Sequence, residues 1–137
     1  MPYATKQDLI DRFGEDELIQ LTDRGGAGVI ADAVLNMAMA DADATIDSYL
    51  AKRYDLPLAE VPPALVPKAA ALVRYLLHDE SPTETVVKNH ELALAWLRDV
   101  AAGRVELDVG GSTPAEADIV LQDGAGPVFT DKTMKGF

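Results

Sequence analysis

Apolar residues recur at intervals of three and four positions through much of the chain, the spacing that places them on one face of an α-helix. The longest such stretch runs from Val29 to Arg53 and predicts the longest helix. The positions that mark its apolar face form two neighbouring lines, which together give one broad stripe facing a partner. These are Ile30, Val34, Met37, Asp41 and Ala44 in one line, and Ala38, Ala42, Ile46, Tyr49 and Leu50 in the other.

Two short helices are predicted before this long one. The first opens at Thr5, whose hydroxyl can accept a hydrogen bond from the Asp8 amide, and Gly14 is its natural end. The second follows with three acidic residues, Glu15 to Glu17, in its first turn, where the helix dipole favours negative charge. The glycine-rich stretch from Asp23 to Gly28 is typical of a loop.

Two further helices are predicted after the link Val61-Pro62-Pro63. The fourth starts at about Pro63 or Pro67 and runs to His78. Two adjacent apolar rows give it a wide face, so we expect it to be central: Leu65, Ala69, Leu72 and Leu76, beside Val66, Ala70, Val73 and Leu77. The fifth opens with Ser81 as the capping residue, Pro82 in the first helical position and Glu84 in the third, and Gly103 is its expected terminator.

The pattern changes after Gly103, where helical spacing stops and glycines and prolines recur. Val105, Leu107 and Val109 alternate with acidic residues, which is typical of a strand, and Ile119 to Leu121 is a second short strand candidate. The sequence thus predicts a mainly α fold: a small bundle of four to five helices over residues 1–103, and an extended C-terminal arm over residues 104–137 that contains short β segments.

The end of this arm is more apolar than the end of a mobile tail usually is. Val128, Phe129, Met134 and Phe137 lie there together with two lysines. Apolar anchors at the end of a flexible segment favour docking onto a partner. The alternative is that the arm folds back on its own domain, and the sequence leaves both open.

Composition narrows the class of protein. A chain of 137 residues holds one domain plus an appendage, and 48% apolar but only 6% aromatic residues favour close helix packing. There is no cysteine, no apolar stretch long enough to span a bilayer, and no signal-like segment at the start, so we expect no disulfide and no membrane partner. A net charge of −11 argues against a protein that binds nucleic-acid phosphates. The acidic residues either keep the protein soluble or form a surface along which DNA passes without binding.

Residues capable of chemistry are few and scattered. A metal site would have to be built from His78 and His90 with carboxylates. A helix-end position explains His78 better, and His90 is expected inside the fifth helix, at its margin. Asp41, Asp43 and Asp47 are expected on a solvated helix face. The glycines at positions 25–28 lack the lysine of a phosphate-binding loop. We therefore expect no catalytic residue, cofactor or metal; an enzyme with a carboxylate site around Asp43, Asp47 or His78 is the weakest of the alternatives.

Several long strings resemble the Mu-like phage family of small head-region morphogenesis proteins. They are Tyr3 to Gly14, Glu17 to Asp23, Ala44 to Leu58 with Val61-Pro62-Pro63, Arg74-Tyr75, and Ala95 to Gly103. The ending Val128 to Asp131 with Gly136-Phe137 is also similar to that family's terminus, whereas Gly110 to Ala125 match least.

This resemblance implies a head-completion protein, or head–tail adaptor, of a tailed phage. Proteins of this kind are helical bundles that form a dodecameric ring in the virion neck, after assembly in the host cytoplasm. Their partners would be the portal protein, a stopper or tail-completion protein, and further copies of the chain, with DNA passing through the lumen without specific binding. The family has no catalytic residues to carry over. A helical binding module or assembly factor that acts during morphogenesis and is absent from the virion is the alternative.

Overall fold

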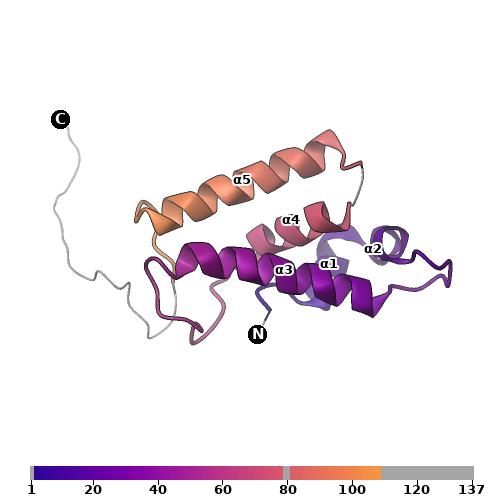
Figure 1. The fold of residues 1–137 in the computed structure, drawn as a ribbon, viewed down its shortest axis with the longest axis horizontal. Helices are drawn as coiled ribbons and strands as arrows, with labels where there is room; N and C mark the ends of the chain where they lie inside the picture. Colours follow the sequence, from indigo (N-terminus) through magenta and orange to yellow (C-terminus); the bar gives the residue numbers. More distant parts are fainter. Residues whose placement is uncertain (1, 79–80, 109–137) are drawn as a thin grey trace.

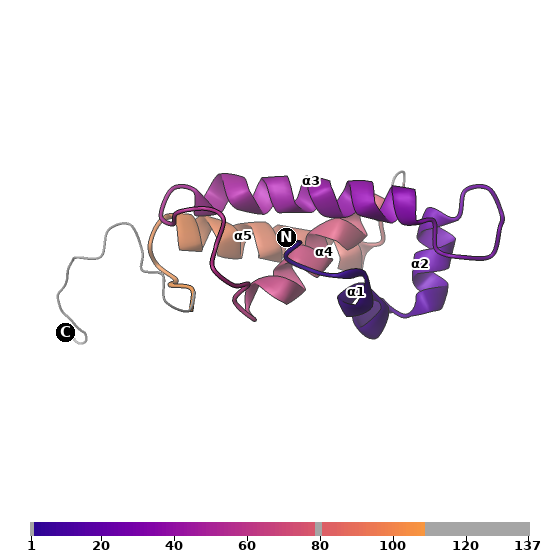
Figure 2. The ribbon, with the colours of Figure 1, turned by 90° about the horizontal axis from the view of Figure 1, so that it is seen from below.

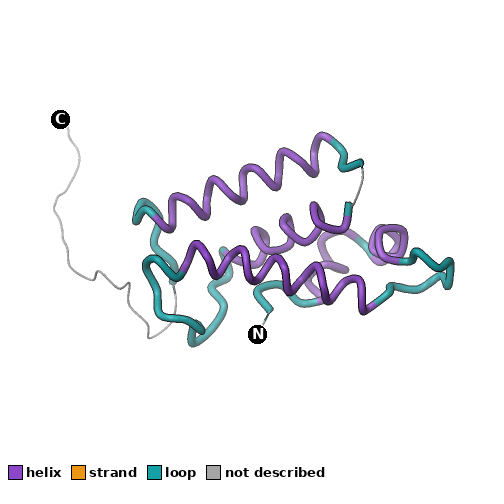
Figure 3. The backbone as a smooth tube through the Cα atoms, viewed as in Figure 1, coloured by secondary structure: helices purple, strands orange, loops and turns teal. Residues whose placement is uncertain are grey.

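A computed structural model of the chain describes residues 2–78 and 81–108. These residues form five α-helices: α1 (Lys6–Phe13), α2 (Glu15–Thr22), α3 (Asp32–Leu50), α4 (Leu65–Leu77) and α5 (Glu84–Ala101) (Figure 1). No strand is present in this part of the chain (Figure 3). The predicted mainly α fold is confirmed.

Three helices form the body of the bundle. Helices α3, α4 and α5 lie side by side and alternate in direction (Figure 1). Helix α4 contacts both of the others and also α1, while α2 lies against α3, so the two short helices cover part of the trio (Figure 2). The predicted central place of α4 is correct.

The burial of α4 explains why its sequence has two apolar rows. Both rows are buried except at their edges, where Leu76 is exposed and Val66 is half-buried. Alanines at positions 69 and 70 keep the helix surfaces close, because each presents a single methyl group to its neighbour. The core that results has contributions from every helix; its largest fully buried side chains include Leu9, Leu18, Leu35, Ile46, Leu50, Leu65, Val73, Leu97 and Val100.

Of the two lines predicted for α3, only the second faces the core along the helix, although Ile30 at the start of the first is buried as well. Ala38, Ala42, Ile46 and Leu50 are buried, but Met37 is 69% exposed, and Asp41 and Ala44 are exposed as well. The helix is turned so that Leu35 and the Ala38 line contact its neighbours, and no described element covers the Met37 side. The helix is also shorter than predicted, because the chain is in loop conformation up to Ala31 and in turns from Ala51.

The capping interactions predicted at the start of the chain are present in the structure. The Asp8 amide donates to Thr5 Oγ1 at 3.1 Å and the Thr5 amide donates to the Asp8 carboxylate at 2.9 Å, which forms a complete capping box. Gly14 ends α1 at a φ of 91°, a left-handed value that glycine tolerates, and α2 begins at the next residue. Both predictions at these positions are confirmed.

The start of α5 differs from the prediction. The capping residue is Thr83, not Ser81: its hydroxyl accepts a hydrogen bond from the Val86 amide at 3.3 Å. Pro82 therefore precedes the cap, where it keeps the chain extended, and Glu84 is the first helical residue.

The end of α5 follows the prediction. Gly103 has a φ of 87°, its amide donates to the Val100 carbonyl, and the Arg104 amide donates to the Asp99 carbonyl at 2.8 Å. These paired bonds are the Schellman arrangement that ends many helices at a glycine. A Cβ atom at this position would also clash with the guanidinium group of Arg53.

The first residues after α5 form no strand, contrary to the alternating pattern of Val105 and Leu107. Without a second strand beside them, the backbone bonds elsewhere: the Leu107 amide donates to the Tyr54 hydroxyl at 2.9 Å, and the Leu107 side chain is buried. The chain is thus attached to the bundle as far as Leu107. Val109, the Ile119 to Leu121 strand candidate and the rest of the arm lie outside the described residues.

We expect Gly103→Ala to lower the free energy of unfolding by about 1–2 kcal/mol, because an L-residue is strained at this left-handed φ. Arg53 must also move away from the new methyl group. Gly25→Ala is the matched control, since a Cβ atom there meets nothing within 4 Å. Urea unfolding of both variants measures the difference. Equal stability of the two variants would contradict this account of the α5 end.

Candidate interaction surfaces

The four predicted anchor residues of the arm lie outside the described residues. Val128, Phe129, Met134 and Phe137 therefore stay predictions. The described bundle offers other surfaces, which are a groove between three helices, an apolar hollow beside α3, and a cluster that holds the N-terminal segment.

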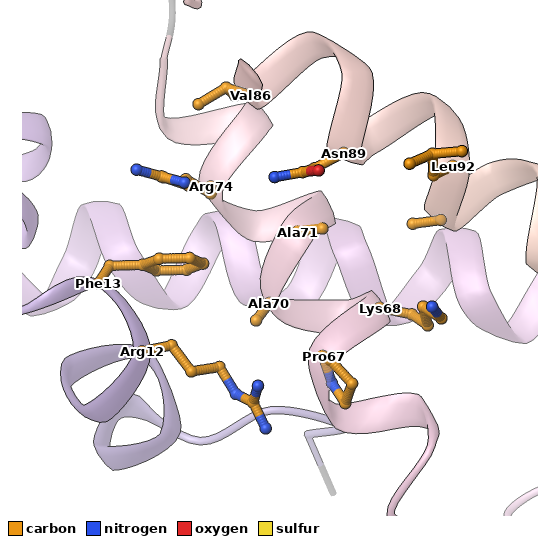
Figure 4. A pocket seen from close by; sticks show the side chains of 11 residues that line it. Arg12, Phe13, Pro67, Lys68, Ala70, Ala71, Arg74, Val86, Asn89 and Leu92 are labelled. Atoms are coloured by element: carbon orange, nitrogen blue, oxygen red, sulfur yellow. The ribbon is translucent and has the colours of Figure 1, made fainter.

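A groove of about 290 Å³ opens between α1, α4 and α5 (Figure 4). Small and apolar side chains line most of it: Phe13, Pro67, Ala70, Ala71, Val86, Leu92 and Ala93. Arg12, Lys68, Arg74 and Asn89 supply its polar groups. We call this surface the basic groove, because none of the residues that line it is acidic although the whole chain has 23 acidic and 12 basic residues.

The basic groove exists because α4 presents alanines where α1 and α5 diverge. Ala70 and Ala71 carry one methyl group each, so they do not fill the space between Phe13 and Leu92. Leu92 is consequently 56% exposed although it belongs to an otherwise well-packed helix. An exposed leucine beside an apolar hollow is a typical place for a partner to bind.

Arg74 forms one fixed wall of the basic groove. Its Nε donates to Glu17 Oε2 at 2.7 Å and its Nη2 donates to Glu17 Oε1 at 2.9 Å, a bidentate pair between α4 and α2. The guanidinium carbon also lies 4.5 Å from the centre of the Phe13 ring. These contacts neutralise Arg74 and hold Phe13 in place.

The other two basic side chains of the groove are available to a ligand. Neither Arg12 nor Lys68 forms an ion pair within residues 2–78 and 81–108. Lys68 Nζ lies 5.4 Å from the centre of the Trp96 ring, which orients the ammonium group without neutralising it. The groove therefore combines an apolar floor with two positive charges that an acidic ligand can neutralise.

A second surface lies on the side of α3 that the core leaves uncovered. A hollow of about 170 Å³ between α3 and α4 is bordered by Met37, Val34 and Leu76, with Arg24 and Asp41 at its edge. Met37 and Leu76 are both exposed there. We call it the Met37 surface; it differs from the basic groove in shape and in charge.

A third cluster holds the N-terminal segment against α3. The Tyr3 amide donates to Asp43 Oδ1 at 3.1 Å, and the Tyr3 hydroxyl donates to Asp47 Oδ1. Asp43 and Asp47 are half-buried, so the prediction of a solvated helix face is wrong for these two and correct for Asp41. The reason is that residues 2–4 fold over this part of α3, and Tyr3 and Ala4 are buried there.

Burial and hydrogen bonding shift the acidity of this cluster. Burial raises the pKa of the Asp43 carboxyl, and the hydrogen bond from the Tyr3 amide partly offsets it. The pKa of the Tyr3 hydroxyl is raised as well, first by burial and then by its hydrogen bond to Asp47. The cluster thus connects the chain start to α3 through a carboxyl that resists ionisation.

Comparison with known proteins identifies the family. A family profile described as "Bacteriophage Mu, Gp36" matches residues 3–121. Gene product J of Escherichia phage Mu is 36% identical over 141 residues, which cover 100% of this chain and 99% of that protein. The Mu-like prophage FluMu protein gp36 of Haemophilus influenzae is 32% identical over 137 residues, which cover 98% and 97%.

The chain belongs to the bacteriophage Mu Gp36 family.

Membership in the Mu Gp36 family confirms the resemblance to Mu-like phage morphogenesis proteins. The match also extends past the end of the described bundle at Asp108, to Leu121. It therefore includes most of the stretch from Gly110 to Ala125, which resembled the family least.

The two histidines have local roles in this family member. His78 lies at the end of α4 with Nδ1 2.9 Å from the Arg74 carbonyl oxygen, in agreement with a helix-end position. His90 stacks on Tyr75 with ring centres 3.9 Å apart, and burial lowers its pKa. Among the described residues, no group of three or more histidine or acidic side chains could hold a metal ion, and no helix is long and apolar enough to cross a membrane.

The loop with three glycines closes on its own acidic residue. The carboxylate of Asp23 accepts hydrogen bonds from the amides of Ala27 at 2.8 Å and Gly28 at 2.6 Å, which lowers its pKa. The buried Thr22 hydroxyl joins this loop to α2 and α3: it donates to the Leu18 carbonyl and accepts from the Ala31 amide. The amides of Ala27 and Gly28 are thus occupied by Asp23, and these residues form a loop, as predicted.

Sequence reasoning missed the basic groove and the Tyr3 cluster. Arg12 and Lys68 belong to different helices, and nothing in their local sequence shows that they face one groove. Tyr3 and Asp47 are 44 positions apart and meet only in the fold. The one usable signal was the lone Leu92 on the otherwise polar side of α5.

We expect Asp43→Asn to stabilise the protein increasingly as pH rises. The raised pKa means that ionising Asp43 costs folding free energy once pH exceeds the ordinary aspartate value of about 3.9, and asparagine removes this cost while keeping an acceptor for Tyr3. The gain should reach less than about 1 kcal/mol and vanish at low pH, where the carboxyl is protonated in both states.

Urea unfolding from pH 3 to pH 7 measures the change in the free energy of unfolding. Asp41→Asn, a substitution of an exposed aspartate, is the control. The control should stay within about 0.5 kcal/mol of the parent protein at each pH. If the gain in unfolding free energy from Asp43→Asn becomes smaller as pH rises, the raised pKa assigned to Asp43 is wrong.

Proposed function

We propose that this chain is a structural subunit of the virion neck, a head–tail adaptor that forms a ring between portal and tail and has no enzymatic activity. The observation that carries the proposal is the pair of unlike surfaces on a bundle of the Mu Gp36 family. A ring closes through head-to-tail contacts, in which one surface of each subunit binds a different surface of the next. The basic groove and the Met37 surface supply two such surfaces.

The apolar and charged residues of the two surfaces support this pairing. The basic groove has two cations, Arg12 and Lys68, that form no ion pair with any described residue. The Met37 surface has one acidic and one basic residue, Asp41 and Arg24, beside apolar side chains that are exposed to solvent. Contact between the apolar residues of both surfaces, with Asp41 beside a cation of the groove, would fix the register of neighbouring subunits.

The acidity of the chain supports a channel for DNA. With a net charge of −11, a ring of many copies presents a high density of negative charge. Phosphates are repelled by such a wall, so DNA passes without the sequence-independent binding that a basic lumen would cause. No specific DNA contact is needed for this role.

The arm provides the connection to other neck proteins. We assign Val128, Phe129, Met134 and Phe137 as the residues that bind the portal protein, and we assign the opposite end of the ring to a stopper or tail-completion protein. Each arm contact is weak by itself, because holding a short stretch of chain in one conformation on a partner costs conformational entropy. Repetition around a dodecameric ring adds these contacts and makes the attachment strong.

We expect that replacing all four anchor residues of the full chain by serine leaves the bundle folded and abolishes head completion. The bundle should be unaffected, because the core formed by residues 2–78 and 81–108 is built without these four residues. Complementation of a phage that lacks this protein, followed by counting infectious particles and tailless filled heads by electron microscopy, measures the effect. Circular dichroism and urea unfolding check that the helices are intact.

The matched control is Thr130→Ala with Thr133→Ala, which changes polar positions in the same stretch of the arm. It should give infectious particles in parental numbers. Mass spectrometry of purified virions should find the chain in many copies. Absence from virions would favour the assembly-factor alternative, and normal particle numbers with the serine variant would exclude the anchor assignment.

A further inference from the structure

The basic groove has the opposite charge to most of the molecule, so its natural ligand is acidic and apolar. One segment of the chain itself has this character: residues 115–123, with Glu116, Asp118 and Asp123 around the apolar triplet Ile119-Val120-Leu121. We propose that residues 115–123 of the arm bind in the basic groove of the same subunit. This inference concerns the free subunit and does not depend on a position in the neck; in the proposed ring, the Met37 surface of the neighbouring subunit would displace the segment from the groove.

Charge selects this segment over the rest of the arm. Residues 115–123 contain three carboxylates and no basic residue, whereas the last ten residues contain Lys132 and Lys135 with a single aspartate. Arg12 and Lys68 attract the first segment and repel lysines. The two parts of the arm therefore have separate tasks, one toward the subunit itself and one toward a partner.

The order of charged and apolar groups fits as well. In the groove, apolar side chains occupy the space between Arg12 on one side and Lys68 on the other (Figure 4). In the segment, the apolar triplet lies between Asp118 and Asp123. The triplet can cover Phe13, Ala71 and the exposed Leu92 while its flanking carboxylates approach the two cations.

The connecting chain is long enough for binding within one subunit. The described chain leaves the bundle at Leu107, next to Tyr54, near the end of α5. Leu92 lies nine residues before Ala101 on that helix, which corresponds to about 14 Å along its axis. Residues 109–118 span up to about 33 Å. A segment on so short a connection has a high effective concentration at its own groove.

Spin labelling of the isolated full-length protein tests the proposal. The chain has no cysteine, so Gln122→Cys introduces a single site for a nitroxide label next to the triplet. We expect the label to cause loss of the methyl signals of Ala71 and Leu92 in NMR spectra, while the Met37 methyl signal is retained. A label at Lys132→Cys, further along the arm, is the matched control and should leave all three signals.

Charge reversal then tests the stated chemistry. Asp118→Lys with Asp123→Lys should restore the Ala71 and Leu92 signals, and so should Arg12→Glu with Lys68→Glu, which breaks no ion pair among the described residues. When both charge reversals are combined, the segment and the groove again have opposite charges, so the Ala71 and Leu92 signals should again be lost. Equal effects of the two labels, or no change on reversal, would overturn the proposal.

A mixed sample distinguishes binding within a subunit from binding between subunits. It contains spin-labelled protein without isotope enrichment and isotope-enriched protein without a spin label, so only contacts between molecules reduce the NMR signals. Signals that disappear in the mixed sample at the same protein concentration would overturn binding within one subunit. All these measurements use the free protein. The adaptor role can therefore fail in the complementation experiment without affecting this inference. Likewise, the arm can fail to bind in the groove without affecting the adaptor role.

Discussion

The packing of α4 against three helices at once is the constraint on which the rest of the structure depends. A helix with neighbours on both sides needs apolar residues over more than half of its surface, and α4 meets this need with two adjacent rows. Close approach also requires small side chains, and Ala69 and Ala70 provide them. The same choice leaves a space beside Ala71 that neither α1 nor α5 fills. The basic groove is therefore a direct consequence of how the core is built.

The sequence predicts those features that depend on neighbouring residues. The capping box of Thr5, the glycines at positions 14 and 103, and the two rows of α4 are local signals, and each was identified correctly. The side of α3 that faces the core was predicted only in part. A pattern with many alanines does not show which of its two apolar rows the neighbouring helices cover. The strand expected at Val105 was wrong because alternation needs a neighbouring strand, and Leu107 binds Tyr54 instead.

The candidate surfaces were harder to predict, because they combine residues that are distant in sequence. A net charge of −11 suggests a uniformly acidic surface, yet Arg12, Lys68 and Arg74 meet around one groove. Similarly, Asp43 and Asp47 have the spacing of a solvated face but bind Tyr3 from the start of the chain. Net charge limits the class of ligand for the whole molecule, but local charge decides what binds at each surface.

The proposed arrangement of the arm answers two opposing requirements. Exposed apolar residues near the end of a chain promote aggregation unless a partner covers them. A groove that holds the middle of the arm shortens its reach, because only the residues after position 123 then extend from the bundle. The attachment must nevertheless remain weak enough to release when a partner binds more strongly. The exposed Arg12, the half-buried Lys68 and one apolar triplet suit this balance, because ion pairs near the surface contribute little each and the apolar contact area is small.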